Sequence, residues 1–130
     1  MEKPVESSIT GRCPLRKAQQ RTTLIVEDDA DFRQLLKEIL SNHFPSMKIG
    51  EATSNKQALK KMKQLAPQLI FMDTHMLDGS SLPLVKRIKK AQPETVIVAV
   101  TLYNIKEYED AAFQSGADYF LAKSSLTSNR

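Results

Sequence analysis

The chain has 130 residues, of which 41% are hydrophobic and 26% are charged, and its formal net charge is +4 at neutral pH. This composition is typical of one small globular domain, and a single cysteine excludes an intramolecular disulfide. No apolar run approaches the roughly 18–20 residues that a membrane-spanning helix needs, and residues 1–20 lack the apolar stretch of a signal peptide. We therefore expect a cytoplasmic domain, with a flexible arm at residues 1–20 and a tail at 128–130.

From Arg21 onward, short apolar runs alternate with segments in which apolar residues recur at helical spacing. The apolar runs predict five strands, at residues 22–26, 48–52, 68–72, 95–100 and 118–122. The helical spacing predicts four helices, bounded by Asp29 and Pro45, by Thr53 or Ser54 and Pro67, by Leu82 and Pro93, and by residues 105–115 with Gly116 behind them. Strands and helices in this alternation predict a parallel sheet, with the carboxyl ends of all strands on one edge.

Four of the predicted strands end at residues that suit phosphoryl chemistry. The first leads into Glu27 and Asp28, the third into Asp73, the fourth into Thr101 and the fifth into Lys123. Ligands of open α/β sheets bind in the crevice outside the carboxyl ends of the strands. Because Mg²⁺ prefers carboxylate, water and phosphate oxygens, these side chains together predict a Mg²⁺-dependent phosphoryl site.

Four segments of the chain resemble the response regulator receiver domain, the phosphoacceptor domain of two-component signalling systems. They read LIVEDD at 24–29, FMDTHMLDGSSL at 71–82, VIVAVT at 96–101 and GADYFLAK at 116–123. Each is weak alone, but four in this order and spacing are specific. The resemblance implies a receiver domain at residues 21–127 with a flavodoxin-like, doubly wound α/β fold, whose five-stranded parallel sheet has the order 2-1-3-4-5.

The resemblance also implies a role for the residues at the strand ends. Asp73 would accept a phosphoryl group from a phosphohistidine on a sensor histidine kinase or a phosphotransfer protein. Glu27, Asp28, Asp73 and the backbone carbonyl of His75 would hold Mg²⁺, with Glu27 acting mainly through water. Lys123 would neutralise a phosphoryl oxygen. Such a chain is a regulatory domain rather than an enzyme, with at most intrinsic self-phosphorylation and autodephosphorylation.

Further residues would switch the domain or set its rates. Thr101 would donate a hydrogen bond to the phosphoryl group and move on activation, and Phe120 would swing inward with it. His75, Leu102 and Tyr103 would modulate the rates of phosphorylation and dephosphorylation. The family normally has a small residue after the switch threonine, so the bulky Leu102 is expected to narrow access to Asp73.

Other departures from the family pattern lie in the loops. Leu77 replaces a common proline, and Ser81 replaces a common glycine. Ser124 replaces the proline that usually follows the lysine, and this leaves two expectations. Either the bond between Lys123 and Ser124 is trans with a shifted lysine, or it is a strained cis bond that costs roughly 2.5–4 kcal/mol.

Only seven residues follow Lys123, and they show no amphipathic helix, whereas the family has a fifth helix there. A truncated fifth helix would leave an apolar strip along the first helix uncovered and favour self-association. We expect the chain to be a piece of a larger regulator. The alternatives are a naturally shortened protein and a partner chain that fills the gap.

Two function classes follow. The first is a phosphorylation-dependent switch that regulates an output domain or a partner, with transcription as the expected process. The second is a constitutive protein-binding module that keeps the fold but has weak or no phosphotransfer. No basic stripe is interleaved with aromatic residues, so we expect no direct nucleic-acid binding and no membrane partner. Asp29 is interpreted as a helix cap, Asp78 and Gly79 as a turn, and the lysines of the second and third helices as solvated.

Overall fold

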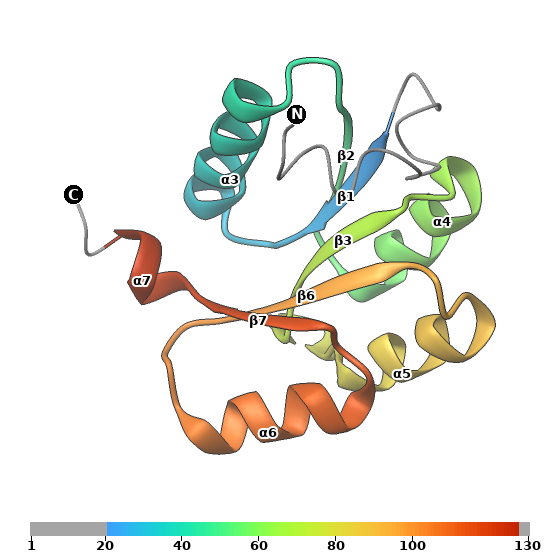
Figure 1. The fold of residues 1–130 in the computed structure, drawn as a ribbon. Helices are drawn as coiled ribbons and strands as arrows, with labels where there is room; N and C mark the ends of the chain where they lie inside the picture. The colour runs from blue at the N-terminus through green and yellow to red at the C-terminus, as the bar shows by residue number, and fades with distance from the viewer. Residues whose placement is uncertain (1–20, 128–130) are drawn as a thin grey trace, which may run out of the picture.

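The computed structural model describes residues 21–127. Five parallel strands form one sheet in the order β2-β1-β3-β6-β7 (Figure 1). They are β1 (Thr22–Val26), β2 (Lys48–Ala52), β3 (Leu69–Asp73), β6 (Val96–Thr101) and β7 (Tyr119–Ala122). This order confirms the predicted flavodoxin-like sheet. The predicted arm at residues 1–20 and tail at residues 128–130 lie outside the described residues.

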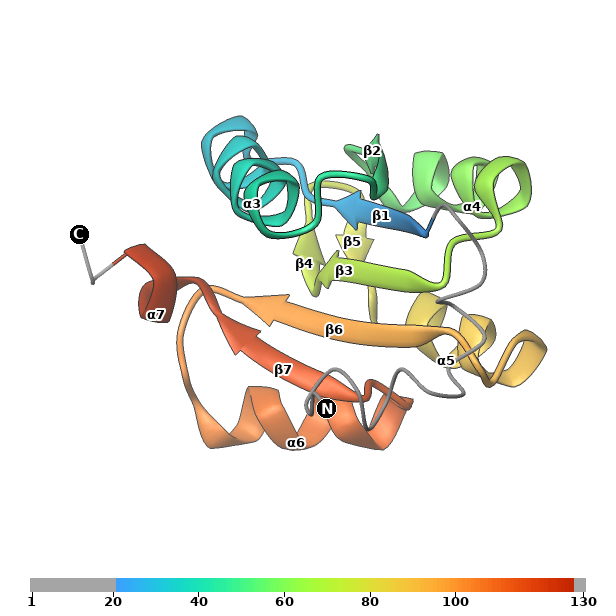
Figure 2. The same cartoon turned by 45° about the horizontal axis from the view of Figure 1, so that its top comes forward.

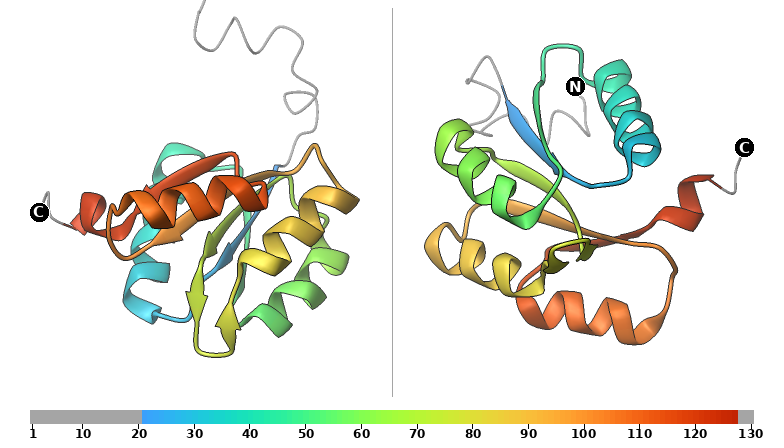
Figure 3. Two further views of the ribbon diagram at one scale, coloured as in Figure 1. Left: turned by 90° about the horizontal axis from the view of Figure 1, so that it is seen from below. Right: turned by 180° about the vertical axis from the view of Figure 1, so that it is seen from behind.

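Helices cover both faces of this sheet (Figures 2 and 3). They are α3 (Ala30–His43), α4 (Asn55–Leu65), α5 (Leu82–Ala91), α6 (Lys106–Ser115) and α7 (Lys123–Thr127). Buried side chains of α4, α5 and α6 pack in one hydrophobic cluster, and those of α3 pack in another, with α7 beside them. Within residues 21–127, no helix combines the length and the apolar character that crossing a bilayer requires.

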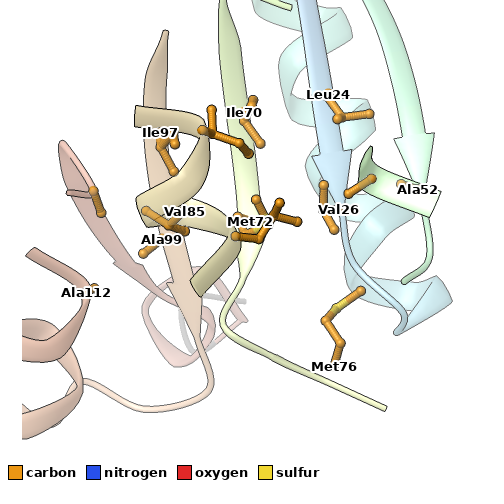
Figure 4. Close-up of a cluster of buried hydrophobic side chains, with 14 residues drawn as sticks. Leu24, Val26, Ala52, Ile70, Met72, Met76, Val85, Ile97, Ala99 and Ala112 are labelled. Atoms are coloured by element: carbon orange, nitrogen blue, oxygen red, sulfur yellow. The ribbon is translucent and has the colours of Figure 1, made fainter. Parts of the chain in front are cut away.

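The two hydrophobic clusters lie on opposite faces of the sheet because side chains alternate along each strand. In β1, Leu24 and Val26 belong to the cluster under α4 and α5, while Ile25 belongs to the cluster under α3. Figure 4 shows the first cluster, in which Met72 of the neighbouring strand β3 lies beside Val26, and Ile97 of β6 lies on the far side of β3. Burial on both faces explains why these strands read as unbroken apolar runs.

The helix ends follow the predicted capping residues. The Asp29 carboxylate accepts hydrogen bonds from the backbone N–H groups of Asp31 and Phe32, so Asp29 caps α3. Of the two candidates for α4, Ser54 is the cap. Gly116 ends α6 with φ of 112°, a left-handed conformation that glycine adopts without steric cost.

A short hairpin after β3 was predicted only as a turn. Strands β4 (His75–Met76) and β5 (Gly79–Ser80) pair antiparallel around Leu77 and Asp78. The Asp78 carboxylate accepts hydrogen bonds from the backbone N–H groups of Asn55 at 3.1 Å and Lys56 at 3.3 Å. Asp78 therefore ties the hairpin to the first turn of α4, a contact that local turn chemistry does not reveal.

The chain after β7 confirms the predicted shortening of the fifth helix. Residues Lys123–Thr127 form the short helix α7, and Leu126 packs against the cluster under α3. Phe32, Leu36 and Leu40 of α3 are at most 7% exposed, so the expected bare apolar strip does not appear on this helix. The bond between Lys123 and Ser124 is trans, since residues 21–127 contain no cis peptide bond. Self-association stays a prediction.

Candidate functional site

Four strand ends bring the predicted site residues together at one edge of the sheet. Glu27 follows β1, Asp73 is the last residue of β3, Thr101 is the last residue of β6, and Lys123 follows β7. The side chains of Glu27, Asp28 and Asp73 each offer a carboxylate oxygen, and these oxygens lie within 4.8 Å of one another. Parallel pairing of β3 with β6 and of β6 with β7 fixes this arrangement.

Backbone amides orient each of the three carboxylates. The Asp73 carboxylate accepts from the N–H of His75 at 3.0 Å, and the Glu27 carboxylate accepts from the N–H of Asp29 at 3.0 Å. The Asp28 carboxylate accepts from the N–H of Leu77, in the hairpin turn, at 2.9 Å. Asp73 and Glu27 are only 5% and 2% exposed. All three acidic side chains are therefore held in place, and Glu27 and Asp73 are largely removed from water while Asp28 is partly exposed.

Lys123 bridges the two buried carboxylates. Its Nζ lies 2.9 Å from Glu27 Oε2 and 3.4 Å from Asp73 Oδ2. The same Nζ lies 5.0 Å from the centre of the Phe32 ring. An ammonium so placed is in position to meet negative charge that arrives at Asp73.

The pKa values of Glu27 and Lys123 reflect their burial and their contacts with each other and with Asp73. Burial raises the pKa of the Glu27 carboxyl to about 7, and its contact with Asp73 acts in the same direction, against the opposing effect of Lys123. Burial by itself would lower the pKa of Lys123, but the hydrogen bond to Glu27 and the charge of Asp73 outweigh it and raise this pKa. A divalent cation would relieve the remaining carboxylate repulsion.

The Thr101 hydroxyl is buried at the same edge and lacks a partner. Thr101 is 1% exposed, and its Oγ1 makes no hydrogen bond within the part of the chain that the structure describes. Leaving a buried polar group without a partner costs about 1–3 kcal/mol. A hydroxyl held in this state suits an incoming ligand that carries oxygen atoms.

A cavity of about 310 Å³ opens over Asp73, and its rim is mostly apolar and aromatic. Leu102 and Tyr103, both 55% exposed, line it together with His75 and Tyr108. The rings of His75 and Tyr108 lie 5.7 Å apart. Sequence reasoning missed Tyr108, because it lies on α6 outside the four motifs and only the fold brings it to the rim.

Phe120 does not line this cavity. It is half-buried and packs against the hydrophobic cluster under α4 and α5. The structure therefore places the predicted switch residues Thr101 and Phe120 on adjacent strands without bringing Phe120 to the site.

Sequence reasoning also missed a second group of side chains, which holds the loop that carries Glu27 and Asp28 in position. Arg33 Nη1 donates to the backbone carbonyl of Glu27 at 2.9 Å, and Arg33 Nε donates to Glu51 Oε1 on β2 at 3.0 Å. Lys37 holds the other oxygen of Glu51 at 2.9 Å. The hydrogen bond from Lys37 is the main cause of the lowered pKa of Glu51. No local motif signals this contact, because it joins α3 to the neighbouring strand.

The donor set fits a hard cation. All three candidate ligand side chains are carboxylates, and Mg²⁺ binds through oxygen ligands, usually one or two carboxylates supplemented by water and phosphate oxygens. No histidine or cysteine of residues 21–127 joins the cluster, so its chemistry does not favour a softer metal.

Comparisons with known proteins agree with the fold. The chain is 30% identical to the chemotaxis protein CheY of Thermotoga maritima over 103 residues, which cover 79% of this chain and 85% of that protein. Several other curated relatives are longer, and the chain spans only 26% to 46% of their length.

Two solved structures have the same fold. One is the signal receiver domain of a DNA-binding response regulator from Colwellia psychrerythraea, with a TM-score of 0.75, 22% identity and coverage of 84% of this chain and 97% of that chain. The other is a response regulator from Burkholderia pseudomallei with a phosphorylated aspartic acid, a calcium ion and citrate. Its TM-score is 0.71 at 26% identity, over 79% of this chain and 59% of that chain.

The family comparison covers nearly all of the described structure. The family model described as the response regulator receiver domain matches residues 23–129. This match includes all five strands of the sheet except the first residue of β1, and every residue of the acidic cluster. The chain therefore belongs to the response regulator receiver domain family of two-component signalling proteins.

Proposed function

We propose that this chain is a phosphorylation-dependent signalling switch whose phosphoacceptor is Asp73. One observation carries the proposal: Asp73 is nearly buried, oriented by a backbone amide, clustered with Glu27 and Asp28, and within reach of the Lys123 ammonium. The donor is a phosphohistidine on a sensor histidine kinase or a phosphotransfer protein. The phosphorylated aspartic acid in the Burkholderia relative supports the same chemistry here.

The transfer forms one bond and breaks another. A carboxylate oxygen of Asp73 attacks the phosphorus atom, the bond from phosphorus to the donor imidazole nitrogen breaks, and its electron pair returns to that nitrogen. Lys123 needs only a small movement to pair with a phosphoryl oxygen, because its Nζ is already 3.4 Å from Asp73. Thr101 supplies its unpartnered hydroxyl to another phosphoryl oxygen.

Asp28 and Asp73 are the proposed direct ligands of Mg²⁺, with Glu27 acting through water and the His75 carbonyl completing the protein ligands. When bound, the ion offsets negative charge on the carboxylates and on the phosphoryl oxygens. The backbone contacts that orient Asp28 and Asp73 keep these carboxylates in position.

The phosphoryl group adds about −1.5 to −2 charge units beside Lys123 and Thr101. We propose that this charge draws the Thr101 hydroxyl inward, lets Phe120 move with it, and so changes the surface that an output domain or a partner recognises. The longer relatives support an output segment, with transcription as the proposed process.

A second function is a binding module with weak phosphotransfer, and the position of Leu102 favours it. Leu102 lines the cavity over Asp73 and also a second hollow of about 360 Å³ between α3 and α7. Its side chain is thus in a position to obstruct donors, and His75 and Tyr103 share the rim.

Phosphotransfer from phosphoimidazole, a small donor with a phosphorus–nitrogen bond, tests the proposal. We expect an acyl phosphate signal in ³¹P NMR that requires Mg²⁺, is absent from Asp73→Asn, and forms faster in Leu102→Ala. A folded wild-type chain and a Leu102→Ala variant that both stay unmodified would favour the binding module instead.

A further inference from the structure

Helices α4 and α5 carry only basic charges. Together they have eight basic side chains and no acidic one: Lys56, Lys60, Lys61, Lys63, Lys86, Arg87, Lys89 and Lys90. Since these helices contribute +8 and the whole chain carries +4, the rest of the sequence carries −4. The excess positive charge of this protein is therefore concentrated on two neighbouring helices.

Most of these cations have no acidic partner. Within residues 21–127, Lys89 is the one that reaches a carboxylate, with its Nζ 2.9 Å from Asp118 Oδ2. The other seven form no ion pair in this part of the chain, and all except the half-buried Lys61 are exposed. Their charge thus faces solvent without local compensation.

A groove runs along the seam between the two helices, which lie side by side (Figure 3, left). It consists of two hollows, of about 400 Å³ and about 180 Å³, that share Leu59 and Arg87 in their linings. Apolar side chains from both helices contribute to these linings, and so do three cations. The apolar ones are Leu59, Met62, Pro83, Leu84, Ile88 and Ala91, and the cations are Lys56, Lys63 and Arg87.

We propose that this α4–α5 groove docks an acidic amphipathic helix of a partner protein. The apolar face of such a helix would lie on the half-buried Leu59 and Met62. Its acidic flanks would meet Lys56, Lys63 and Arg87. Helix α4 has 11 residues, so the groove spans about 16 Å, the length of a helix of three turns. This inference does not depend on phosphorylation of Asp73.

The groove suits a protein helix better than a nucleic acid. Its described lining contains no aromatic side chain on which a base could stack. From the sequence, these lysines were interpreted as solvated. The groove was not predicted, because it forms only when α4 and α5 pack together.

A labelled peptide tests the proposal. The probe is a synthetic helix of about four turns with leucine on one face and glutamate on its flanks, titrated with the full chain by fluorescence anisotropy. We expect the charge reversal Lys56→Glu, Lys63→Glu and Arg87→Glu to weaken binding at least about tenfold. The matched control, Lys48→Glu with Lys86→Glu and Lys90→Glu, changes the net charge equally at exposed residues outside the groove. It should weaken binding less than about threefold.

Several outcomes would overturn the proposal. They are no binding of the peptide to the wild-type chain, equal weakening in both triple variants, and amide NMR shifts that map away from α4 and α5. Tighter binding of a DNA duplex or of anionic phosphatidylserine vesicles to the same groove would assign it to another class of partner. Urea unfolding of each variant establishes that loss of binding does not reflect loss of the fold.

Discussion

Among residues 21–127, the Thr101 hydroxyl is a buried side-chain oxygen without a hydrogen-bond partner. Thr101→Val keeps the shape of the side chain and removes the hydroxyl. We therefore expect the free energy of unfolding to rise by about 1 kcal/mol, while phosphorylation at Asp73 becomes slower. Urea unfolding and the rate of phosphorylation measure the two effects. A variant less stable than the wild type would mean that this hydroxyl is bonded in solution.

Arg33 positions the loop that carries Glu27 and Asp28, because it joins the Glu27 carbonyl to Glu51 on β2. Arg33→Met removes both contacts, and we expect Mg²⁺ affinity to fall by about tenfold in isothermal titration calorimetry. Lys37→Met is the matched control, since Lys37 pairs with Glu51 but makes no hydrogen bond to Glu27. Equal losses in both variants would show that the ion pairs act on the site only through general stability.

At the scale of elements, the hairpin of β4 and β5 accepts hydrogen bonds from the first turn of α4, in addition to those made by the Ser54 cap. Asp78→Ala removes two backbone hydrogen bonds at the first turn of that helix, and we expect the free energy of unfolding to fall by about 1 kcal/mol. Glu94→Ala, at an exposed acidic residue before β6, controls for the lost charge. Chemical denaturation compares the two, and an equal effect would assign the loss to charge alone.

The ion pair between Lys37 on α3 and Glu51 on β2 predicts that the free energy of unfolding depends on pH. The hydrogen bond from Lys37 lowers the folded-state pKa of Glu51 below its ordinary value of 4.5. The stability contributed by Glu51 is thus fully present above pH 4.5 and is lost as the pH falls through the folded-state pKa. The difference in unfolding free energy between the wild type and Glu51→Gln should narrow over that range. A difference that is constant from pH 6 to pH 3 would contradict this assignment.

For the whole molecule, most of the fold could be predicted from the sequence, because its strands are buried on both faces and its helices are capped locally. Leu24 and Ile25 pack on opposite faces, and Asp29 caps α3, as their patterns predict. The convergence of the candidate site residues was predictable for the same reason, since parallel strands end at one edge.

The parts that sequence reasoning missed depend on contacts between distant elements. Arg33 on α3 forms a hydrogen bond with Glu51 on β2, and the ring of Tyr108 lies beside the ring of His75 at the cavity rim. Asp78 accepts a hydrogen bond from the first turn of α4, a helix that comes earlier in the sequence. The packing of the short helix α7 was missed because its segment is polar, and Leu126 joins the cluster under α3 through tertiary contacts. Pattern and spacing contain no signal for such pairings.

The central claim is that Asp73 accepts one phosphoryl group in a Mg²⁺-dependent manner. The most direct measurement is the intact mass of the chain after incubation with acetyl phosphate, with and without Mg²⁺, beside Asp73→Asn. We predict that the wild type gains the mass of a single phosphoryl group only with Mg²⁺ and that the variant gains none. An unmodified, folded wild-type chain, or an Asp73→Asn variant modified to the same extent, would contradict the claim.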